Sequence, residues 1–175
     1  LESLKIQRCF FDSLSPLSLC DLSSLYCLAI ENCPNRDGLH RLNGLSSDIT
    51  KSLKELVVYK SNLKDISPLS DCDLSSLEKL DLRHNSSISS LSPLRGSDLS
   101  SLKYLYLGHT NISDLSPLCE CKGLALEELN LRETPIKDLS PLSLLDLSCL
   151  KKPINLKKTK VSDLSPLKNI PYDAV

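Results

Sequence analysis

The sequence predicts an α/β solenoid, a right-handed superhelix with a concave parallel β-sheet and convex 3₁₀ or short helical turns. Two observations lead to this fold class. A Ser-Pro pair recurs at one place in six units of the chain. The segment Leu-x-x-Leu-x-Leu begins seven units at intervals of 24 to 28 residues, at Leu1, Leu25, Leu53, Leu77, Leu102, Leu126 and Leu150. Repetition at this period is typical of stacked units that share one core.

The leucine segment predicts a short strand at the start of every unit. Counted from the first leucine, the residues at the fourth and sixth positions alternate with others, which places both on one face of a strand. Only 4% of the residues are aromatic and there is no Trp, so leucine must supply most of the core. Because one strand cannot bury this face alone, we expect seven parallel strands stacked into one sheet.

The ninth position of each unit holds a small or polar residue, where the chain turns away from the sheet. Side chains of this kind can bond the backbone groups that such a turn leaves open. We therefore expect the ninth position to stabilise the turn in every unit. The residues are Cys9, Cys33, Ser61, Asn85, Thr110, Thr134 and, displaced by one, Thr159.

The Ser-Pro pairs predict where the convex turns begin. Serine is a favoured helix N-cap, and proline at the first helical position loses no hydrogen bond. We therefore expect each serine to cap a short helical or 3₁₀ turn on the outer side of its unit. The six serines are Ser15, Ser67, Ser92, Ser116, Ser140 and Ser165.

The second and seventh units depart from this pattern. The second unit lacks a Ser-Pro pair and carries four additional residues near 34–38, either as a tolerated insertion or as a contact loop at the rim of the sheet. Leucines then recur every three residues at Leu39, Leu42 and Leu45, which predicts a longer convex helix. In the seventh unit Pro153 lies beside the strand, where it removes a hydrogen bond, so we expect this strand to be weak.

These units resemble the leucine-rich-repeat family over nearly the whole chain. The phrase Asn-Ile-Ser-Asp-Leu-Ser-Pro-Leu at 111–118 is most similar to the internalin-like subclass, which includes bacterial and protozoan surface proteins. The usual period of that subclass is shorter than the period of this chain. Cys9 and Cys33 depart from the asparagine that many members carry at the ninth position, and they resemble the cysteine-containing repeats of intracellular members. The resemblance implies the same solenoid that the repeat predicts.

The strand positions without leucine predict a binding surface. Residues at the third, fifth, seventh and eighth positions point outward on the concave side of the sheet. In units three to six they include tyrosine and arginine, which are enriched at binding hot spots. The alternative is that exposed strands favour tyrosine for structural reasons alone. The candidate partner-binding residues are Tyr59, Arg83, His84, Tyr104, Tyr106, His109 and Arg132.

Two functions fit this pattern. The first is a protein–protein interaction module that binds a protein partner through its concave face. The alternative is a structural or regulatory repeat array that positions flanking domains or senses for them. We expect residues 1–175 to form a single repeat array within a larger protein, because neither end carries the polar cap that solenoids need.

Other functions find little support in the sequence. No glycine-rich phosphate loop, His-Glu-x-x-His motif or convergent Ser, His and Asp set occurs, so we expect no enzyme and no cofactor. His84 and His109 share one position in adjacent units but lack further ligands, so we predict no metal site. A net charge of −1 argues against nucleic acid, as does the lack of aromatic residues in the basic segment 151–168. No apolar run approaches the roughly 18 residues of a membrane span.

Eight cysteines raise the question of the cellular compartment. Cys20, Cys72 and Cys121 share one position, which predicts a small apolar slot in the convex core. Cys20 and Cys72 are two units apart, too distant to form a disulfide. We therefore expect free thiols and a cytoplasmic location, with a secreted or cell-surface location as the alternative. Two triplets that match the N-glycosylation pattern, at Asn85 and Asn111, favour the alternative.

Overall fold

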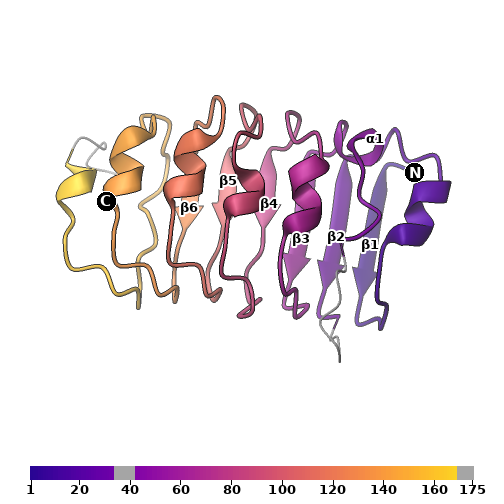
Figure 1. The fold of residues 1–175 in the computed structure, drawn as a ribbon, viewed down its shortest axis with the longest axis horizontal. Helices are drawn as coiled ribbons and strands as arrows, with labels where there is room; N and C mark the ends of the chain where they lie inside the picture. The colour runs from indigo at the N-terminus through magenta and orange to yellow at the C-terminus, as the bar shows by residue number, and fades with distance from the viewer. Residues whose placement is uncertain (34–41, 169–175) are drawn as a thin grey trace.

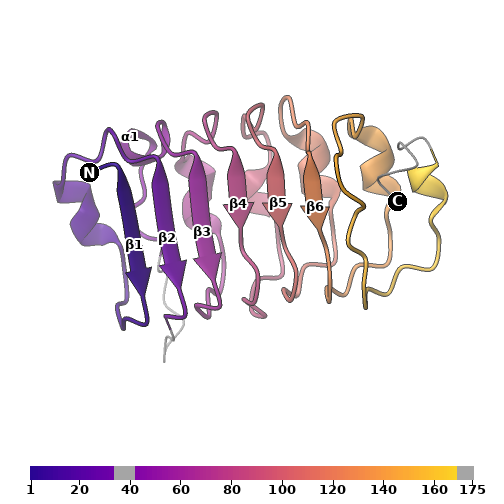
Figure 2. The same ribbon diagram turned by 180° about the vertical axis from the view of Figure 1, so that it is seen from behind.

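The computed structural model describes residues 1–33 and 42–168, and it confirms the α/β solenoid (Figure 1). Within these residues one six-stranded sheet is parallel throughout, and its strands follow each other in chain order. All six strands point to the same edge of the sheet (Figure 2). The strands are β1 (Ser3–Gln7), β2 (Cys27–Glu31), β3 (Glu55–Tyr59), β4 (Lys79–Asp81), β5 (Tyr104–Tyr106) and β6 (Glu128–Asn130).

Short helices cover the opposite side of the sheet (Figure 1). One is the α-helix α1 (Ser47–Thr50), and the other described helices are 3₁₀ helices, as the sequence predicts. None of these helices is long and apolar enough to cross a membrane. The 3₁₀ helices are η1 (Ser15–Leu19), η2 (Ser67–Asp71), η3 (Ser92–Leu94), η4 (Ser116–Glu120), η5 (Ser140–Leu144) and η6 (Ser165–Leu167).

The register of the sheet stacks the leucines of the repeat in columns. At the fourth position Leu28 pairs with Leu56, Leu56 pairs with Leu80, and the column continues through Leu105 to Leu129. All five side chains are fully buried in one core cluster. Burial of a leucine side chain stabilises a fold by about 1.5–3 kcal/mol. Equal register between neighbouring strands therefore builds a continuous aliphatic core.

The ninth-position side chains bond the turn, as predicted, and Asn85 shows how. Its Oδ1 accepts the backbone N–H groups of Ser61 at 3.1 Å and Leu63 at 2.9 Å. Its Nδ2 donates to the carbonyl oxygens of Val58 at 2.6 Å and Leu82 at 2.9 Å. The Asn85 side chain is fully buried, so one amide joins the third unit to the fourth.

The same kind of bond recurs along the stack. The Ser61 hydroxyl donates to the carbonyl of Ile30 at 3.2 Å, and the Cys33 thiol donates to the carbonyl of Ile6 at 3.6 Å. In the fifth unit the Thr110 hydroxyl donates to a carbonyl three residues earlier, at 2.6 Å. Each turn thus has a side chain that satisfies its open backbone groups.

The serines of the Ser-Pro pairs begin the 3₁₀ helices but do not cap them, which corrects the prediction. Each serine is the first helical residue, and the leucine or isoleucine before it occupies the N-cap position without a side-chain bond. The side chain two residues before the serine accepts the N–H of that serine instead, and it is an aspartate in four units and a serine, Ser13 or Ser90, in the other two. Asp114 accepts both the N–H and the hydroxyl of Ser116 at 2.8 Å. A carboxylate can reach an N–H group two residues ahead, which is the Asx-turn geometry.

The convex helix of the second unit is shorter than predicted. Leu39 and the loop at 34–38 lie outside the described residues, so the loop remains a prediction. Helix α1 begins only after Leu45, so the predicted helix through Leu42 and Leu45 is wrong. Gly44 interrupts it with a φ of +100°, and a Cβ at this glycine would lie 2.5 Å from the backbone of Ser15.

The seventh unit adds a single bridge to the sheet where the sequence predicts a seventh strand. Asn155 pairs with Asn130, and its carbonyl accepts the N–H of Leu131 at 3.0 Å. Pro153 has no N–H group to donate, and it displaces the leucine pattern of this unit by one residue. The predicted weakness of this strand is confirmed, whereas its full pairing is not.

Candidate functional site

The predicted contact residues lie on the side of the sheet opposite the helices, which we call the sheet face. Tyr59 ends β3, while Tyr104 and Tyr106 begin and end β5. Arg83 follows β4 by two residues, and Arg132 follows β6 by two. All five side chains are partly exposed, because they occupy the third, fifth or seventh position of their units, and these positions alternate with the buried leucines.

Arg83 lies at the centre of an aromatic cluster. Its guanidinium carbon is 4.9 Å from the ring centroid of Tyr106 and 5.7 Å from that of Tyr59, which is within cation–π range. Asp81 binds the same guanidinium through two contacts, Nε–Oδ1 at 2.9 Å and Nη2–Oδ2 at 2.6 Å. The Asp81 side chain is only 3% exposed. A buried, two-point ion pair therefore fixes the orientation of Arg83 between the two rings.

Two histidines extend this cluster toward β6. The ring of His84 stacks on that of His109, with centroids 3.9 Å apart and planes 17° apart. The edge of Tyr59 meets His84 at a centroid distance of 5.1 Å. Burial, followed by the nearby His109, lowers the pKa of His84, so this imidazole is neutral at pH 7. We call Tyr59, Arg83, His84, Tyr106 and His109 the aromatic–arginine patch.

A left-handed backbone presents the two histidines, with φ values of 61° at His84 and 58° at His109. Non-glycine residues seldom adopt this conformation. Bonds to the next unit hold it here, as the N–H of His84 donates to the carbonyl of Gly108 at 3.0 Å. Every unit has a positive φ at this place, in Arg8, Asn32, Lys60, His84, His109, Glu133 and, displaced by one, Lys158.

Glu133 connects the patch to Arg132. One carboxylate oxygen lies 3.0 Å from Nδ1 of His109, and the other lies 3.1 Å from Arg132 and 3.0 Å from Lys158. The hydrogen bond from Lys158 is the largest cause that lowers the pKa of Glu133. The structure thus brings five predicted residues into direct contact and joins Arg132 to them through a carboxylate.

Asp81 and Glu133 hold the patch in place, yet the candidate set from the sequence omits both. The sequence contains an indication of the role of each residue. Asp81 precedes Arg83 by two residues, so both side chains lie on one face of the strand. Glu133 occupies the same position in its unit as His109 does in the adjacent unit. An opposite charge two residues away on one strand could therefore have identified Asp81, and a partner at the same position of the neighbouring unit could have identified Glu133.

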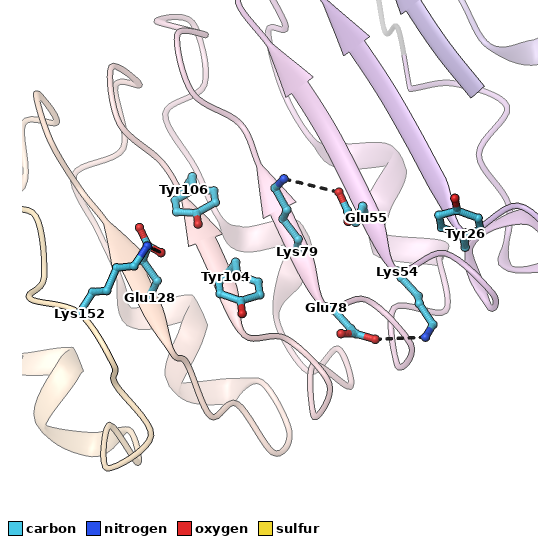
Figure 3. Close-up of a pocket in the computed structure, with 9 residues that line it drawn as sticks. All are labelled: Tyr26, Lys54, Glu55, Glu78, Lys79, Tyr104, Tyr106, Glu128 and Lys152. Carbon is cyan, nitrogen blue, oxygen red and sulfur yellow. Dashed lines mark hydrogen bonds and ion pairs between the residues drawn. The ribbon is translucent and has the colours of Figure 1, made fainter. Parts of the chain in front are cut away.

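Tyr104 makes a different contact, near the edge where the strands begin (Figure 3). Its hydroxyl donates to Glu127 at 3.1 Å. Tyr26, Tyr104 and Tyr106 line one hollow of about 490 Å³ on the sheet face. Burial, followed by the charge of Glu128, raises the pKa of Tyr106 to about 12, so its hydroxyl stays protonated. Tyr26, which the sequence analysis did not select, is 44% exposed at this hollow.

Alternating charges line the same hollow, and Figure 3 shows two of their ion pairs. Lys54 and Lys103 both pair with Glu78, at 3.3 Å and 2.9 Å, and Lys79 pairs with Glu55 at 3.5 Å. We give the name charge ladder to the charged residues of the hollow together with Lys103, Glu127 and Lys151, which pair with charges at the same edge. It consists of Lys54, Glu55, Glu78, Lys79, Lys103, Glu127, Glu128, Lys151 and Lys152.

The ladder compensates the basic residues at the start of the seventh unit. Lys151 pairs with Glu127 at 2.9 Å, and Lys152 pairs with Glu128 at 2.7 Å. The acidic residues of the sixth unit thus balance the lysines that begin the seventh. Positive charge at this edge of the sheet is therefore largely neutralised within the chain.

The eight cysteines are free thiols, and Cys27 lines a hollow of the sheet face together with Tyr59 and Arg83. Cys72 and Cys121 pack against the core, as predicted, and burial raises the pKa of Cys121 to about 11. Cys20 occupies the same position but is exposed, which corrects the prediction. Cys121 donates to the carbonyl of Leu94 in the preceding unit, and Cys72 likewise contacts Thr50 in the unit before its own, whereas Cys20 belongs to the first unit. In 1–33 and 42–168 no group of three His, Cys, Asp or Glu side chains could hold a metal.

Comparisons with known proteins agree with the repeat. The leucine rich repeat family model matches residues 51–112, and a model of two leucine rich repeats matches residues 100–143. Internalin C2 from Listeria monocytogenes is 30% identical, with a TM-score of 0.72 over 98% of this chain and 68% of its own. None of the curated proteins matches this chain.

Two further solved structures show the same fold at lower identity. An internalin (InlF) from Listeria monocytogenes is 22% identical with a TM-score of 0.58, over 97% of this chain and 58% of its own. A leucine-rich-repeat protein from Leptospira interrogans is 19% identical with a TM-score of 0.53, over 97% of this chain and 47% of its own.

Proposed function

Because this chain belongs to the leucine-rich-repeat family, in its internalin-like form, we propose that it is an interaction module whose sheet face binds a protein partner. Proteins with this fold generally mediate protein–protein interactions and are typically not enzymes. The observation that carries the proposal is the aromatic–arginine patch. Tyrosine and arginine in such a patch are the residue types that dominate binding energy at protein interfaces.

The patch is organised for binding before any partner arrives. Asp81 fixes Arg83, the Tyr59 and Tyr106 rings flank it, and the two histidines stack at 3.9 Å. A side chain that is already ordered loses little entropy on binding, so more of its contact energy contributes to affinity. Tyr104 and Arg132 extend the candidate contact surface on either side of the patch.

The experiment that tests this proposal begins with photo-cross-linking, which compares a cross-linker at Lys60 on the sheet face with one at Lys122 on the helix side. We expect a protein partner to be captured from Lys60 and not from Lys122. The captured protein is then purified, and its dissociation constant is measured by calorimetry.

The decisive measurement is the affinity of that partner for the double variant Tyr59→Ala/Tyr106→Ala. Truncation of one hot-spot residue costs about 2 kcal/mol, so we expect the affinity to fall by roughly thirtyfold or more. The matched control is Leu19→Ala/Leu144→Ala, which removes exposed apolar side chains from the helix side and should leave the affinity unchanged. Equal affinity for both variants would contradict the proposal and favour the alternative, an array that positions or senses for flanking domains.

A further inference from the structure

Charge is distributed unequally between the two edges of the sheet face. At the second and third positions, where the strands begin, the seven units carry five cations and five anions. At the seventh and eighth positions, where the strands end, they carry six cations and two anions, with the seventh unit counted one residue later because of its displacement. We call this second edge the basic rim. Its charged residues are Arg8, Glu31, Lys60, Arg83, Arg132, Glu133, Lys157 and Lys158.

Several cations of the basic rim retain binding capacity. Lys60 and Lys157 are exposed, and neither forms an ion pair with a residue that the structure describes. Arg83 uses Nε and Nη2 to bind Asp81, and this pair does not use its Nη1. Within the basic rim Glu133 pairs with Arg132 and Lys158, whereas at the opposite edge each of the five lysines pairs with a glutamate. The excess positive charge of the sheet face therefore belongs to the basic rim.

Gly108 leaves a gap in the basic rim between two arginines. It occupies the seventh position of its unit, as Arg83 and Arg132 do in the units on either side. A Cβ at Gly108 would come within 3.1 Å of the Arg132 carbonyl oxygen, so a side chain there would meet backbone. Strands two places apart are separated by roughly 10 Å. A carboxylate that enters the gap would thus have an arginine on each side.

On the premise of the proposed function, we propose that the part of the partner on the basic rim is an acidic peptide segment. Its carboxylates face Lys60, Arg83, Arg132 and Lys157. These cations come from the third to the seventh unit, a distance of roughly 19 Å at the usual strand spacing. An extended segment rises about 3.3 Å per residue, so about six residues cover this distance.

A single extended chain fits this edge better than a nucleic acid or an anionic membrane. Beyond the basic rim the chain turns toward the helices through Asp114, Asp138 and Asp163. These carboxylates are exposed, and hydrogen bonds from the following serines lower their pKa values, so they are charged at pH 7. A wide polyanion laid over the rim would also meet this negative row. A narrow peptide can contact the cations alone.

The test measures the binding of hexaglutamate to the whole chain by fluorescence anisotropy. Hexaglutamine, a DNA hexanucleotide and vesicles of phosphatidylserine and phosphatidylcholine serve as comparisons. We expect saturable binding of hexaglutamate that exceeds binding of all three comparisons and weakens as salt is added. Binding of the hexanucleotide or the vesicles as strong as that of hexaglutamate would overturn the proposal.

Charge reversal locates the site. Lys60→Glu/Lys157→Glu should weaken hexaglutamate binding by about tenfold or more, because two attractive charges become repulsive. The matched control Lys51→Glu/Lys122→Glu makes the same change in net charge outside the sheet face, and we expect it to change the affinity by less than about twofold. Circular dichroism verifies that both variants are folded. An equal loss in both variants would show that only net charge matters, which also overturns the proposal.

The two proposals can fail separately. The partner identified by cross-linking is measured against Lys60→Glu/Lys157→Glu as well as Tyr59→Ala/Tyr106→Ala. If only the tyrosine variant loses affinity, the sheet face binds a partner that is not acidic at the rim, and this inference alone is wrong. If neither variant loses affinity, both proposals are wrong. Loss of affinity in both variants, with the control pair unaffected, supports both.

Discussion

At the scale of single residues, Asn85 is a buried amide that joins two units of the stack. It accepts two backbone N–H groups and donates to carbonyl oxygens of both units. We expect Asn85→Ala to lower the free energy of unfolding by about 3 kcal/mol or more, because several buried backbone groups lose their partner. Urea denaturation measures this change.

The control for Asn85 is Thr110→Ala, at the ninth position of the next unit. The Thr110 hydroxyl donates to the carbonyl of Leu107, so we expect a loss of about 1 kcal/mol. If the two substitutions cost the same, the amide of Asn85 contributes no more than one ordinary hydrogen bond. The bonds that Asn85 forms between the two units would then add little to the stability of the turn.

The cysteines differ enough in exposure to be separated by a thiol reagent. Cys9, Cys20 and Cys149 are exposed, whereas burial raises the pKa of Cys72 and Cys121. Since the thiolate is the reactive form, we expect iodoacetamide at pH 8 to modify the three exposed cysteines first. Peptide mass spectrometry of timed samples follows each site. Modification of Cys121 as fast as Cys149 would contradict the buried environment of Cys121.

The same spectra bear on the compartment, which remains a prediction. A cytoplasmic protein should yield mostly free thiols when it is isolated without reductant. Four native disulfides would support the secreted or cell-surface alternative. Glycosylation of Asn111, which is exposed, would also support the alternative, whereas Asn85 is fully buried and bonds the turn.

At the scale of the elements, aspartate–serine turns link the stability of the fold to pH. Hydrogen bonds from the serine two residues ahead lower the pKa of seven aspartates below the ordinary value of 3.8. The folded state thus favours the charged form. Its contribution is present above pH 4 and is lost as pH falls through the lowered values. The residues are Asp21, Asp73, Asp98, Asp114, Asp138, Asp146 and Asp163.

We therefore expect the urea midpoint of unfolding to be steady between pH 7 and pH 5 and to fall below about pH 4. The variant Asp114→Asn/Asp138→Asn keeps an oxygen acceptor at two of these turns but removes the titrating group. Its midpoint should decline less steeply below pH 4 than that of the wild type. Parallel curves for the two proteins would show that these turns do not couple stability to pH.

The elements also show how much of the fold the sequence predicts. The alternation of leucines correctly predicts the strands β1 to β6, because the face that carries the leucines must be buried, whereas the seventh unit forms only a bridge. The start of each 3₁₀ helix at Ser-Pro is also correct, yet the predicted cap is not. A serine cap would accept an N–H two or three residues later, whereas Asp114 accepts the N–H of Ser116 itself, because Ser116 is already the first helical residue.

The candidate site was predictable in its positions but not in its contacts. The repeat places Tyr59, Arg83 and Tyr106 on one face, and the structure has them there. Arg83 lies between the two rings because Asp81 binds its guanidinium. The ring of His84 stacks on that of His109 because both residues have a positive φ. Neither feature follows from spacing alone, because both require the direction of a particular side chain.

At the scale of the whole molecule, the described units form a stack in which each unit contacts mainly its neighbours. Such arrays derive stability from the units and from the interfaces between them. The aromatic–arginine patch draws residues from the third, fourth and fifth units, so it exists only while these units are stacked. Leu105 lies in the middle of this region, and it pairs with Leu80 on one side and Leu129 on the other.

This arrangement separates stability from binding within β5. Leu105 is fully buried, so we expect Leu105→Ala to lower the free energy of unfolding by about 2–5 kcal/mol through the cavity it leaves. Tyr104 and Tyr106 flank Leu105 on the other face of the strand. Their truncation to alanine should change stability by about 1 kcal/mol or less, because both side chains are partly exposed and lie outside the leucine core. Chemical denaturation of the three single variants measures these differences.

Position in the stack supplies the control for Leu105. Leu4 occupies the same place in β1, but it is only partly buried and pairs with Leu28 on one side. We expect Leu4→Ala to cost less than half as much as Leu105→Ala, or about 1–2 kcal/mol, because the outer strand loses fewer contacts. If both cost the same, the free energy of the array is not a sum over adjacent interfaces. A defect at its edge would then disturb the central patch as much as a defect directly beneath it.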